Sequence, residues 1–321
     1  MLMKRAKKAN SEESLKELPL ITVITLSYKS VYLYDAINSV LSQNYPFIQY
    51  IISDDGTEGF NKESLLHYID ENNKGNICEV LVLHNETNMG IVANYNRALR
   101  AAKGKYIFPL AADDKYVNES VLYRWTTAFS QVDAPVMCAY CDNYDETMNT
   151  FLGRWPRPDH ARLLQEGDTS KIYHVMERVK IIPGASMART LESLQTLGFF
   201  DETYFLLEDY PFLMKMLRKG VKIAFWPHSA VMRRGGGVSD GNKRHPLLDR
   251  DMELFYEREV YRFSSDPEGL RRSIEQQRIK SLNIRTFSDK WASSGMLGKL
   301  ALCFRSPSCF ARKVYHKLLK I

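Results

Sequence analysis

Short apolar runs alternate with amphipathic segments along the first 130 residues of the chain. Runs of four to eight β-branched and aromatic residues predict buried strands, and apolar residues at 3.6-residue spacing predict helices. The predicted strands cover residues 21–26, 48–52, 80–83 and 106–112, and the predicted helices cover 31–41, 65–69, 91–102 and 120–129. This order, with short connections, predicts an α/β fold built on a doubly wound, mainly parallel sheet with right-handed crossovers.

The pattern is less regular beyond residue 130. A strand is predicted at 136–140 and another at 221–226, with helices at 191–197 and from Asp209 onward. Pro156, Pro158 and Gly167 predict that residues 142–182 are irregular. Residues 233–239 combine two arginines with three glycines, which favours a flexible loop that wraps amides and guanidiniums around phosphate. A plain solvated loop is the alternative.

Paired carboxylates follow two of the predicted strands, Asp54 and Asp55 after one and Asp113 and Asp114 after the other. Such charges are either solvated in turns or neutralised by a divalent cation and a ligand. Neighbouring parallel strands would place both pairs at one rim, where open α/β sheets bind ligands. No Gly-x-Gly-x-x-Gly follows the first strand and no Gly-Lys-Ser/Thr loop occurs, which disfavours dinucleotide-binding and P-loop proteins.

Composition is that of an ordinary globular protein, with 321 residues of which 45% are hydrophobic and 26% charged. No segment approaches the roughly 20 apolar residues of a membrane-spanning helix. The amino terminus lacks the apolar run of a secretory signal, which predicts a cytoplasmic protein. Cys138 and Cys141 have no zinc-ligand partners at suitable spacing, so we expect them to be buried and reduced.

The formal net charge of +6 is concentrated at the carboxyl end, where residues 266–321 contain 12 Lys/Arg and 4 Asp/Glu. Between residues 291 and 321, apolar residues recur at near-helical spacing among basic ones, which favours amphipathic helices on an anionic membrane surface. Packing of those apolar faces on the main domain is the alternative. The predicted organisation is a polar lead-in (1–18), a main domain (19–240) and a helical basic extension (241–321). The protein is predicted to be peripheral on the inner face of the cell membrane.

Several ordered motifs within residues 20–240 resemble the family 2 inverting glycosyltransferases of the GT-A, Rossmann-like fold. The motifs are Thr22–Tyr28, Ala36–Gln43, Asp54–Thr57, Asn88–Gly90, Asp113–Asp114, and Gly198–Asp201 followed by Glu208–Asp209. The resemblance implies that Asp209 is the catalytic base and that Asp114 is a ligand of Mn²⁺ or Mg²⁺. It also implies a nucleotide- and donor-binding set, with Asp55 at the nucleobase, Asp113 near the ribose and an arginine at the diphosphate: Leu26, Tyr28, Asp55, Asn88, Asp113, Arg233 and Arg234. A plain helix-capping role for Asp209 is the alternative.

The implied activity is metal-dependent, inverting transfer of one hexosyl or N-acetylhexosaminyl group from a nucleotide-sugar, with UDP-sugar preferred. The implied acceptor is a hydroxyl of a glycan or polyprenyl-linked saccharide in bacterial-type surface polysaccharide synthesis, and no nucleic acid is involved. The Gln-x-x-Arg-Trp motif of processive synthases does not follow Asp209, which favours single addition. Asn94–Asn96 replaces an Ala-Arg-Asn of many members, so the nucleotide base stays open. Two alternatives are a nucleotidyltransferase, which would carry a basic Gly-rich loop after the first strand, and a non-catalytic nucleotide-sugar- or carbohydrate-binding protein.

Overall fold

The computed structural model describes residues 18–237 and 245–279. The chain divides into two compact units, residues 1–255 and 256–321, which are described separately. The proposed lead-in at 1–17 and the basic segment at 291–321 lie outside the described residues.

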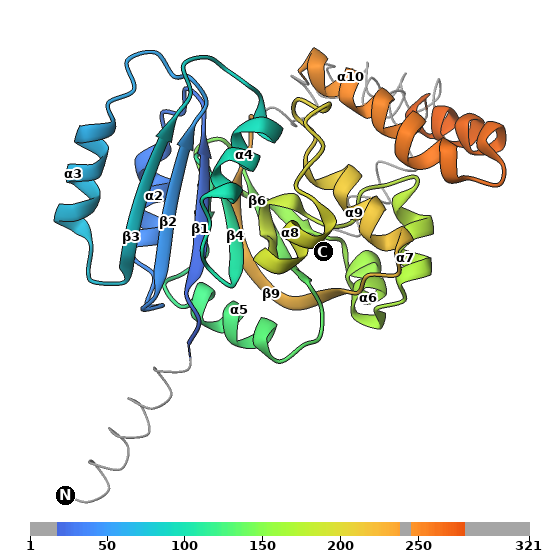
Figure 1. Cartoon of the computed structure of the whole chain (residues 1–321). Coiled ribbons are helices and arrows are strands. Elements are labelled where there is room, and N and C mark those ends of the chain that lie inside the picture. Colours follow the sequence, from blue (N-terminus) through green and yellow to red (C-terminus); the bar gives the residue numbers. More distant parts are fainter. Residues whose placement is uncertain (1–17, 238–244, 280–321) are drawn as a thin grey trace, which may run out of the picture. The chain divides into compact units, whose positions relative to one another are not determined.

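One mixed sheet runs through the described part of the first unit, and its first half is parallel (Figure 1). Four strands lie side by side in the order β3-β2-β1-β4. They are β1 (Ile21–Ser27), β2 (Ile48–Asp54), β3 (Ile77–His84) and β4 (Tyr106–Ala111). All three pairings between them are parallel, which confirms the doubly wound arrangement expected from the sequence.

Helices connect these strands across both faces of the sheet. The connecting helices are α2 (Leu33–Leu41), α3 (Lys62–Asn72) and α4 (Ile91–Arg100), and α5 (Val121–Ser130) follows β4 in the chain. The chain moves from β1 to β3 in one direction and then crosses to β4 on the other side of β1. Right-handed crossovers therefore place α2 and α4 on opposite faces, and Figure 1 shows α4 in front of the sheet and α2 behind it. The strand order reverses between β1 and β4, where ligands bind in open α/β sheets.

The second half of the sheet mixes parallel and antiparallel pairs. Its strands are β5 (Lys115–Tyr116), β6 (Val136–Tyr144), β7 (Phe151–Trp155), β8 (Met187–Thr190) and β9 (Ile223–Arg234). β8 runs antiparallel to both β4 and β6, while β6 and β9 are parallel. β7 forms an antiparallel hairpin with the second half of β6, and β5 pairs antiparallel with β9. Cys138 and Cys141 of β6 are free and fully buried, as predicted.

The prediction that residues 142–182 are irregular is wrong. This region contains the end of β6, the strand β7, and two helices, α6 (Pro158–Glu166) and α7 (Thr169–Met176). Pro158 stands in the first turn of α6, where a missing N–H costs nothing, and Gly167 ends the helix with φ of 68°. Asp168 then caps α7 by accepting a hydrogen bond from the N–H of Lys171 at 3.0 Å. The residues that suggested irregularity are therefore helix boundaries.

Four further elements complete the described part of the first unit around the candidate site. A short 3₁₀ turn at Gly184–Ser186 precedes β8, and the helices are α8 (Leu191–Leu197), α9 (Asp209–Arg218) and α10 (Pro246–Phe255). The expected boundary at residue 240 is corrected, because α10 belongs to the first compact unit and buries Asp251 and Phe255 there.

The described part of the second unit is helical. It consists of a π-helical turn at Tyr256–Val260, a 3₁₀ turn at Tyr261–Phe263 and a helix over residues 267–279. Arg271 joins the last of these to the first through a salt bridge with Glu257 at 3.0 Å. Across the described residues of both units, no helix is long and apolar enough to cross a membrane.

Candidate active site

Five of the predicted site residues lie at the carboxyl ends of β1, β2 and β4: Leu26, Tyr28, Asp55, Asp113 and Asp114. Asn88 lies between β3 and α4, Arg233 and Arg234 end β9, and Asp209 begins α9. Ser27 of β1 lies opposite Asp54 of β2, and Leu26 lies opposite Ala111 of β4. The two carboxylate pairs therefore follow strands that flank β1 and end at the same rim of the sheet. Parallel pairing produces this convergence, as expected from the sequence.

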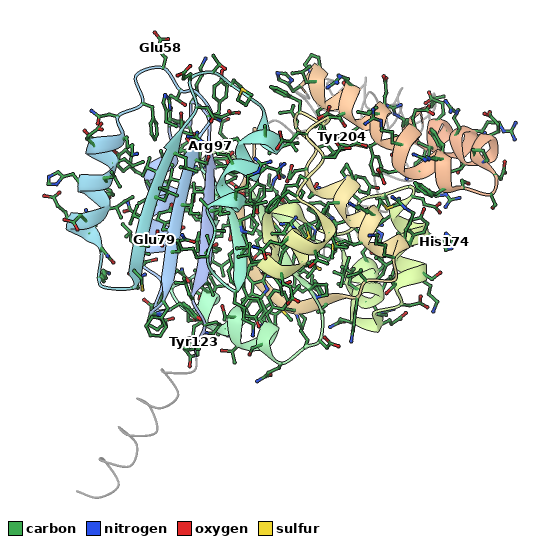
Figure 2. The ribbon with its side chains drawn as sticks, viewed as in Figure 1. Glu58, Glu79, Arg97, Tyr123, His174 and Tyr204 are labelled. Carbon is green, nitrogen blue, oxygen red and sulfur yellow. The ribbon has the colours of Figure 1, made fainter. Side chains whose placement is uncertain are left out.

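Asp55 organises the loop between β3 and α4. Its carboxylate is buried and accepts three hydrogen bonds, from Asn85 Nδ2 at 2.8 Å, the N–H of Met89 at 2.8 Å and the N–H of Gly90 at 2.9 Å. Gly90 has φ of 88°, and a Cβ there would lie 2.6 Å from the carbonyl oxygen of Phe205, so glycine is required. Arg97 of α4, labelled in Figure 2, donates to Asn85 Oδ1. Asp55 thus holds in place the loop that carries Asn88.

Tyr28, Asn88 and Leu26 lie on the open side of this loop. The phenol of Tyr28 is 44% exposed, and its hydrogen bond with Asn88 holds the pKa of Tyr28 below the ordinary value. Leu26 is only partly buried in an otherwise buried stretch of β1, and its carbonyl accepts the N–H of Ala112 at 3.0 Å. An exposed aromatic ring beside a hydrogen-bonding amide and a buried carboxylate is a surface suited to a nucleobase.

Asp113 and Asp114 form a buried, electrostatically strained pair. Burial raises the pKa of Asp114 to about 8, with a further contribution from the charge of Asp113, and burial also raises the pKa of Asp113. Asp114 Oδ1 accepts the N–H of Arg234 at 2.9 Å, which fixes the carboxylate against β9. Burial outweighs the nearby charges of Arg233 and Arg234, and two adjacent carboxylates in this setting suit a hard divalent cation that takes its remaining ligands from phosphate oxygens and water. No group of three or more His, Cys, Asp or Glu side chains is placed to hold a metal anywhere in the described residues, so Asp113 and Asp114 would hold a cation only with such outside ligands.

Arg233 and Arg234 are not in a flexible loop, because β9 continues to Arg234. The guanidinium of Arg234 is buried, and each of its three nitrogens donates within the chain: Nε to the carbonyl of Asp113 at 3.0 Å, Nη1 to the carbonyl of Glu146 at 2.8 Å and Nη2 to Asp35 Oδ2 at 2.9 Å. It also lies 3.7 Å from the centroid of the Tyr32 ring. Arg234 therefore fastens the turn at Asp113 to its neighbours, whereas Arg233 is only partly buried, with Nη1 3.3 Å from Asn143 Oδ1.

Asp209 begins α9 and is 2% exposed. The Nζ of Lys180 donates to Asp209 Oδ2. The same oxygen packs on Gly184, where a Cβ would lie only 2.1 Å away, so any larger residue at 184 would displace the carboxylate. The Asp209 carboxylate is therefore held by a partner 29 positions away, which is an arrangement beyond that of a simple helix cap.

Glu208 stands next to Asp209 and shares its environment. Burial raises the pKa of Glu208 to about 7, the charge of Asp209 adds to the shift, and the ammonium of Lys180 opposes it. Two carboxylates and one ammonium therefore occupy the start of α9, in a setting that perturbs proton affinity as functional sites often do.

The segment before α9 is anchored by Asp251 of α10. Asp251 is fully buried, and its Oδ2 accepts the N–H groups of Phe205, Leu206 and Leu207 at 2.8, 2.6 and 3.2 Å. Tyr204, just before these residues, is labelled in Figure 2. Neither Lys180 nor Asp251 was predicted, because no local pattern marks a lysine or an aspartate that pairs with a distant segment.

Two contacts connect the start of α9, which carries Asp209, with the elements that carry the other predicted site residues. The turn at Gly184–Ser186, on which Asp209 packs, itself packs against β4, β6 and β9. The N–H of Val92, in the first turn of α4, lies 3.3 Å from the carbonyl of Phe205 in the segment before α9. The carboxylates after β4 and the carboxylate of α9 consequently border one region.

Comparison with known proteins agrees with this architecture. Residues 22–177 match the model of glycosyl transferase family 2. TuaG of Bacillus subtilis, whose name refers to teichuronic acid biosynthesis, is 35% identical over 106 residues, which cover 32% of this chain and 39% of TuaG. GlyG, a glycosyltransferase of Streptococcus pneumoniae, is 30% identical over 133 residues, which cover 41% of this chain and 42% of GlyG. The chain thus spans about two fifths of the length of these two curated relatives.

Solved structures confirm the GT-A fold class. The crystal structure of S. aureus TarS 1-349 in complex with UDP-GlcNAc is similar with a TM-score of 0.56 at 16% identity, covering 74% of this chain and 64% of that one. The same TarS fragment in complex with UDP gives a TM-score of 0.52 at 15% identity, covering 78% and 74%. At this identity the likeness establishes the fold alone.

Proposed function

We propose that this chain is an inverting glycosyltransferase that transfers one sugar from a UDP-sugar to a hydroxyl of a saccharide acceptor in surface polysaccharide synthesis. The observation that carries the proposal is the pair of carboxylate sites bordering one region: Asp113 and Asp114 after β4, and Asp209 held by Lys180 at the start of α9. The match of residues 22–177 to the family model supports the reaction class, and the name of TuaG supports the polymer class.

The residues divide into a donor side and an acceptor side. On the donor side, Tyr28, Asn88 and Asp55 bind the nucleobase, Leu26 and Asp113 line the ribose, and Arg233 approaches the diphosphate. Asp114 would hold Mn²⁺ or Mg²⁺, which when bound neutralises charge on the departing diphosphate. Arg234 acts indirectly, by fixing the turn at Asp113 through its three hydrogen bonds.

On the acceptor side, Asp209 removes the proton from the attacking hydroxyl as the new glycosidic bond forms. One base on the face opposite the leaving group gives in-line displacement and inversion, with no covalent sugar intermediate. Lys180 fixes the Asp209 carboxylate, and Asp251 fixes the segment that leads to it.

The test is release of UDP from UDP-glucose, UDP-galactose, UDP-GlcNAc and UDP-GalNAc with Mn²⁺ or Mg²⁺, with and without saccharide acceptors. Asp209→Asn should lower turnover on the order of 10²–10⁴-fold while calorimetry shows donor affinity within about twofold of the wild type. Glu192→Gln, an exposed acid at the start of α8, is the control and should match the wild type in both measurements. Parallel loss of donor affinity in Asp209→Asn would indicate a structural role for Asp209. Failure of the wild type to bind or cleave any UDP-sugar would refute the proposed function.

A further inference from the structure

Trp155 is an incompletely buried indole next to the Asp209 carboxylate. It is the last residue of β7 and is partly exposed, whereas Trp125 in the core is fully buried. The Nζ of Lys180 lies 5.9 Å from the centroid of the Trp155 ring and 5.9 Å from that of Tyr210. The same Nζ donates to Asp209 Oδ2, so a single ammonium separates the indole from the proposed base.

The sheet places Trp155 on the acceptor side of the site. Trp155 pairs with Cys141 of β6, Cys141 pairs with Val231 of β9, and Val231 pairs with Tyr116 of β5, two residues after Asp114. Three strand spacings of about 4.8 Å put Trp155 roughly 14 Å across the sheet from that position. Trp155 and the turn at Asp114 are thus separated by the width of β6 and β9.

The hairpin that carries Trp155 is fixed firmly enough to serve as a platform. The guanidinium of Arg154 forms a salt bridge with Asp142 at 2.7 Å, and the N–H of Gly235 donates to the carbonyl of Tyr144 at 3.0 Å. Arg234 also donates to the carbonyl of Glu146 at the tip of the hairpin. The β6–β7 hairpin is therefore tied to the end of β9, which borders the donor side.

We propose that the face of Trp155 stacks on the terminal sugar ring of the acceptor and presents its hydroxyl to Asp209. An aromatic face offers a flat apolar surface to the C–H groups of a sugar ring, and rigid aromatic side chains provide contact area at little entropic cost. This inference rests on the proposed function and adds a specificity-determining residue on the acceptor side. It specifies a saccharide acceptor and disfavours a non-carbohydrate alcohol.

The experiment compares four proteins: the wild type, Trp155→Leu, Trp155→Phe and the control Phe151→Leu. Phe151 is also an aromatic residue of β7, is 52% exposed and packs on Tyr144, at the opposite end of the strand from the base. Two rates are measured with UDP-sugar and Mn²⁺: UDP release to water alone, and UDP release with rising concentrations of the methyl β-glycosides of glucose, galactose and N-acetylglucosamine.

Trp155→Leu should keep UDP release to water within about twofold of the wild type, because the donor side is untouched. It should need roughly 3- to 10-fold more methyl glycoside for half-maximal stimulation, the range expected for loss of one aromatic stack. Trp155→Phe should restore most of the difference, and Phe151→Leu should behave as the wild type.

Three results would overturn the inference. The first two are equal half-maximal concentrations for Trp155→Leu and the wild type, and no stimulation of the wild type by any of the three glycosides. If Trp155→Leu loses UDP release to water to the same extent as stimulated release, Trp155 supports Asp209 structurally and the stacking role is rejected. Absence of UDP release from the wild type under every condition, by contrast, refutes the proposed function itself.

Discussion

Replacement of Asp251 should loosen the segment in front of Asp209 and slow sugar transfer while leaving donor binding intact. One fully buried carboxylate oxygen accepts three consecutive N–H groups, from residues 205, 206 and 207. These groups belong to the segment that leads directly into α9 and its first residue, Asp209. The segment touches the donor-side loop at Gly90 and Val92 through the carbonyl of Phe205. The proposed donor residues have other anchors, since Asp55 is held by Asn85 and Asp114 by the N–H of Arg234.

The magnitude follows from the number and type of the hydrogen bonds. A hydrogen bond to a charged group contributes about 1.5–3 kcal/mol, and a neutral one about 0.5–1.5 kcal/mol. Asp251→Asn keeps an acceptor but loses the charge, so we expect a loss of about 2 kcal/mol. Asp251→Leu removes the acceptor altogether. Because part of the segment can rehydrate, we expect a loss of about 4 kcal/mol rather than the full sum.

Thermal unfolding measures this loss. At about 2–4 °C per kcal/mol for a unit of this size, Tm should fall by about 4–8 °C in Asp251→Asn and about 8–16 °C in Asp251→Leu. Glu253→Gln, an exposed acid on the same helix, is the matched control and should stay within about 1 °C of the wild type. Below the transition, Asp251→Asn should lower kcat with an unchanged donor KM. A Tm for Asp251→Leu equal to that of Glu253→Gln would refute the anchoring role. A rise in donor KM would show that Asp251 affects donor binding, which contradicts the prediction.

Three further outcomes are expected. Asp114→Asn should abolish most turnover and weaken metal-dependent UDP binding together, since an amide is a poorer ligand for a hard cation than a carboxylate. Calorimetry with and without Mn²⁺ measures the UDP binding, and undiminished turnover would exclude the metal role. Because the pKa of Glu208 is raised to about 7 in the folded protein, the wild type should lose stability relative to Glu208→Gln as pH rises from about 4.5 to 7 and no further above that; denaturation midpoints across this range that run parallel would contradict the shift. Replacing Lys313 and Lys317 by Gln in the full chain should reduce sedimentation with anionic vesicles at low salt, and equal sedimentation of both proteins would reject the membrane role of the basic segment.

The parallel half of the fold could be predicted because its signals are local. Strands such as Tyr106–Ala111 are continuous apolar runs, and the helices between the strands show apolar residues at helical spacing. The region from 142 to 182 could not be predicted in the same way, since its helices have only nine and eight residues and its proline and glycine mark their ends. The length of β9 was underestimated for a different reason. Pro227 and His228 interrupt its apolar run, and pairing with β6 rather than sequence pattern keeps it extended to Arg234.

How well the site residues could be predicted follows the same division between local and long-range signals. Carboxylates at strand ends could be placed at one rim from the strand pattern, because parallel pairing converts a position in the sequence into a position on the sheet. The groups that hold the carboxylates could not be found, since they come from remote segments: Lys180 pairs with Asp209 across 29 positions, Asp251 with Phe205 across 46 and Arg234 with Asp35 across 199.

This difference bears on how the site tolerates change. A buried charge must have a partner, so each of these remote residues is as necessary to the geometry as the carboxylate or backbone group that it holds. Arg234 shows the consequence most clearly, because a guanidinium expected to bind diphosphate is occupied by Asp35 and by the carbonyls of Asp113 and Glu146. Removing it would leave its acceptors unpaired and release the turn that carries Asp114, the proposed metal ligand. Loss of donor binding in an Arg234 variant would therefore report a displaced turn, and only a variant of Arg233 can report a lost phosphate contact.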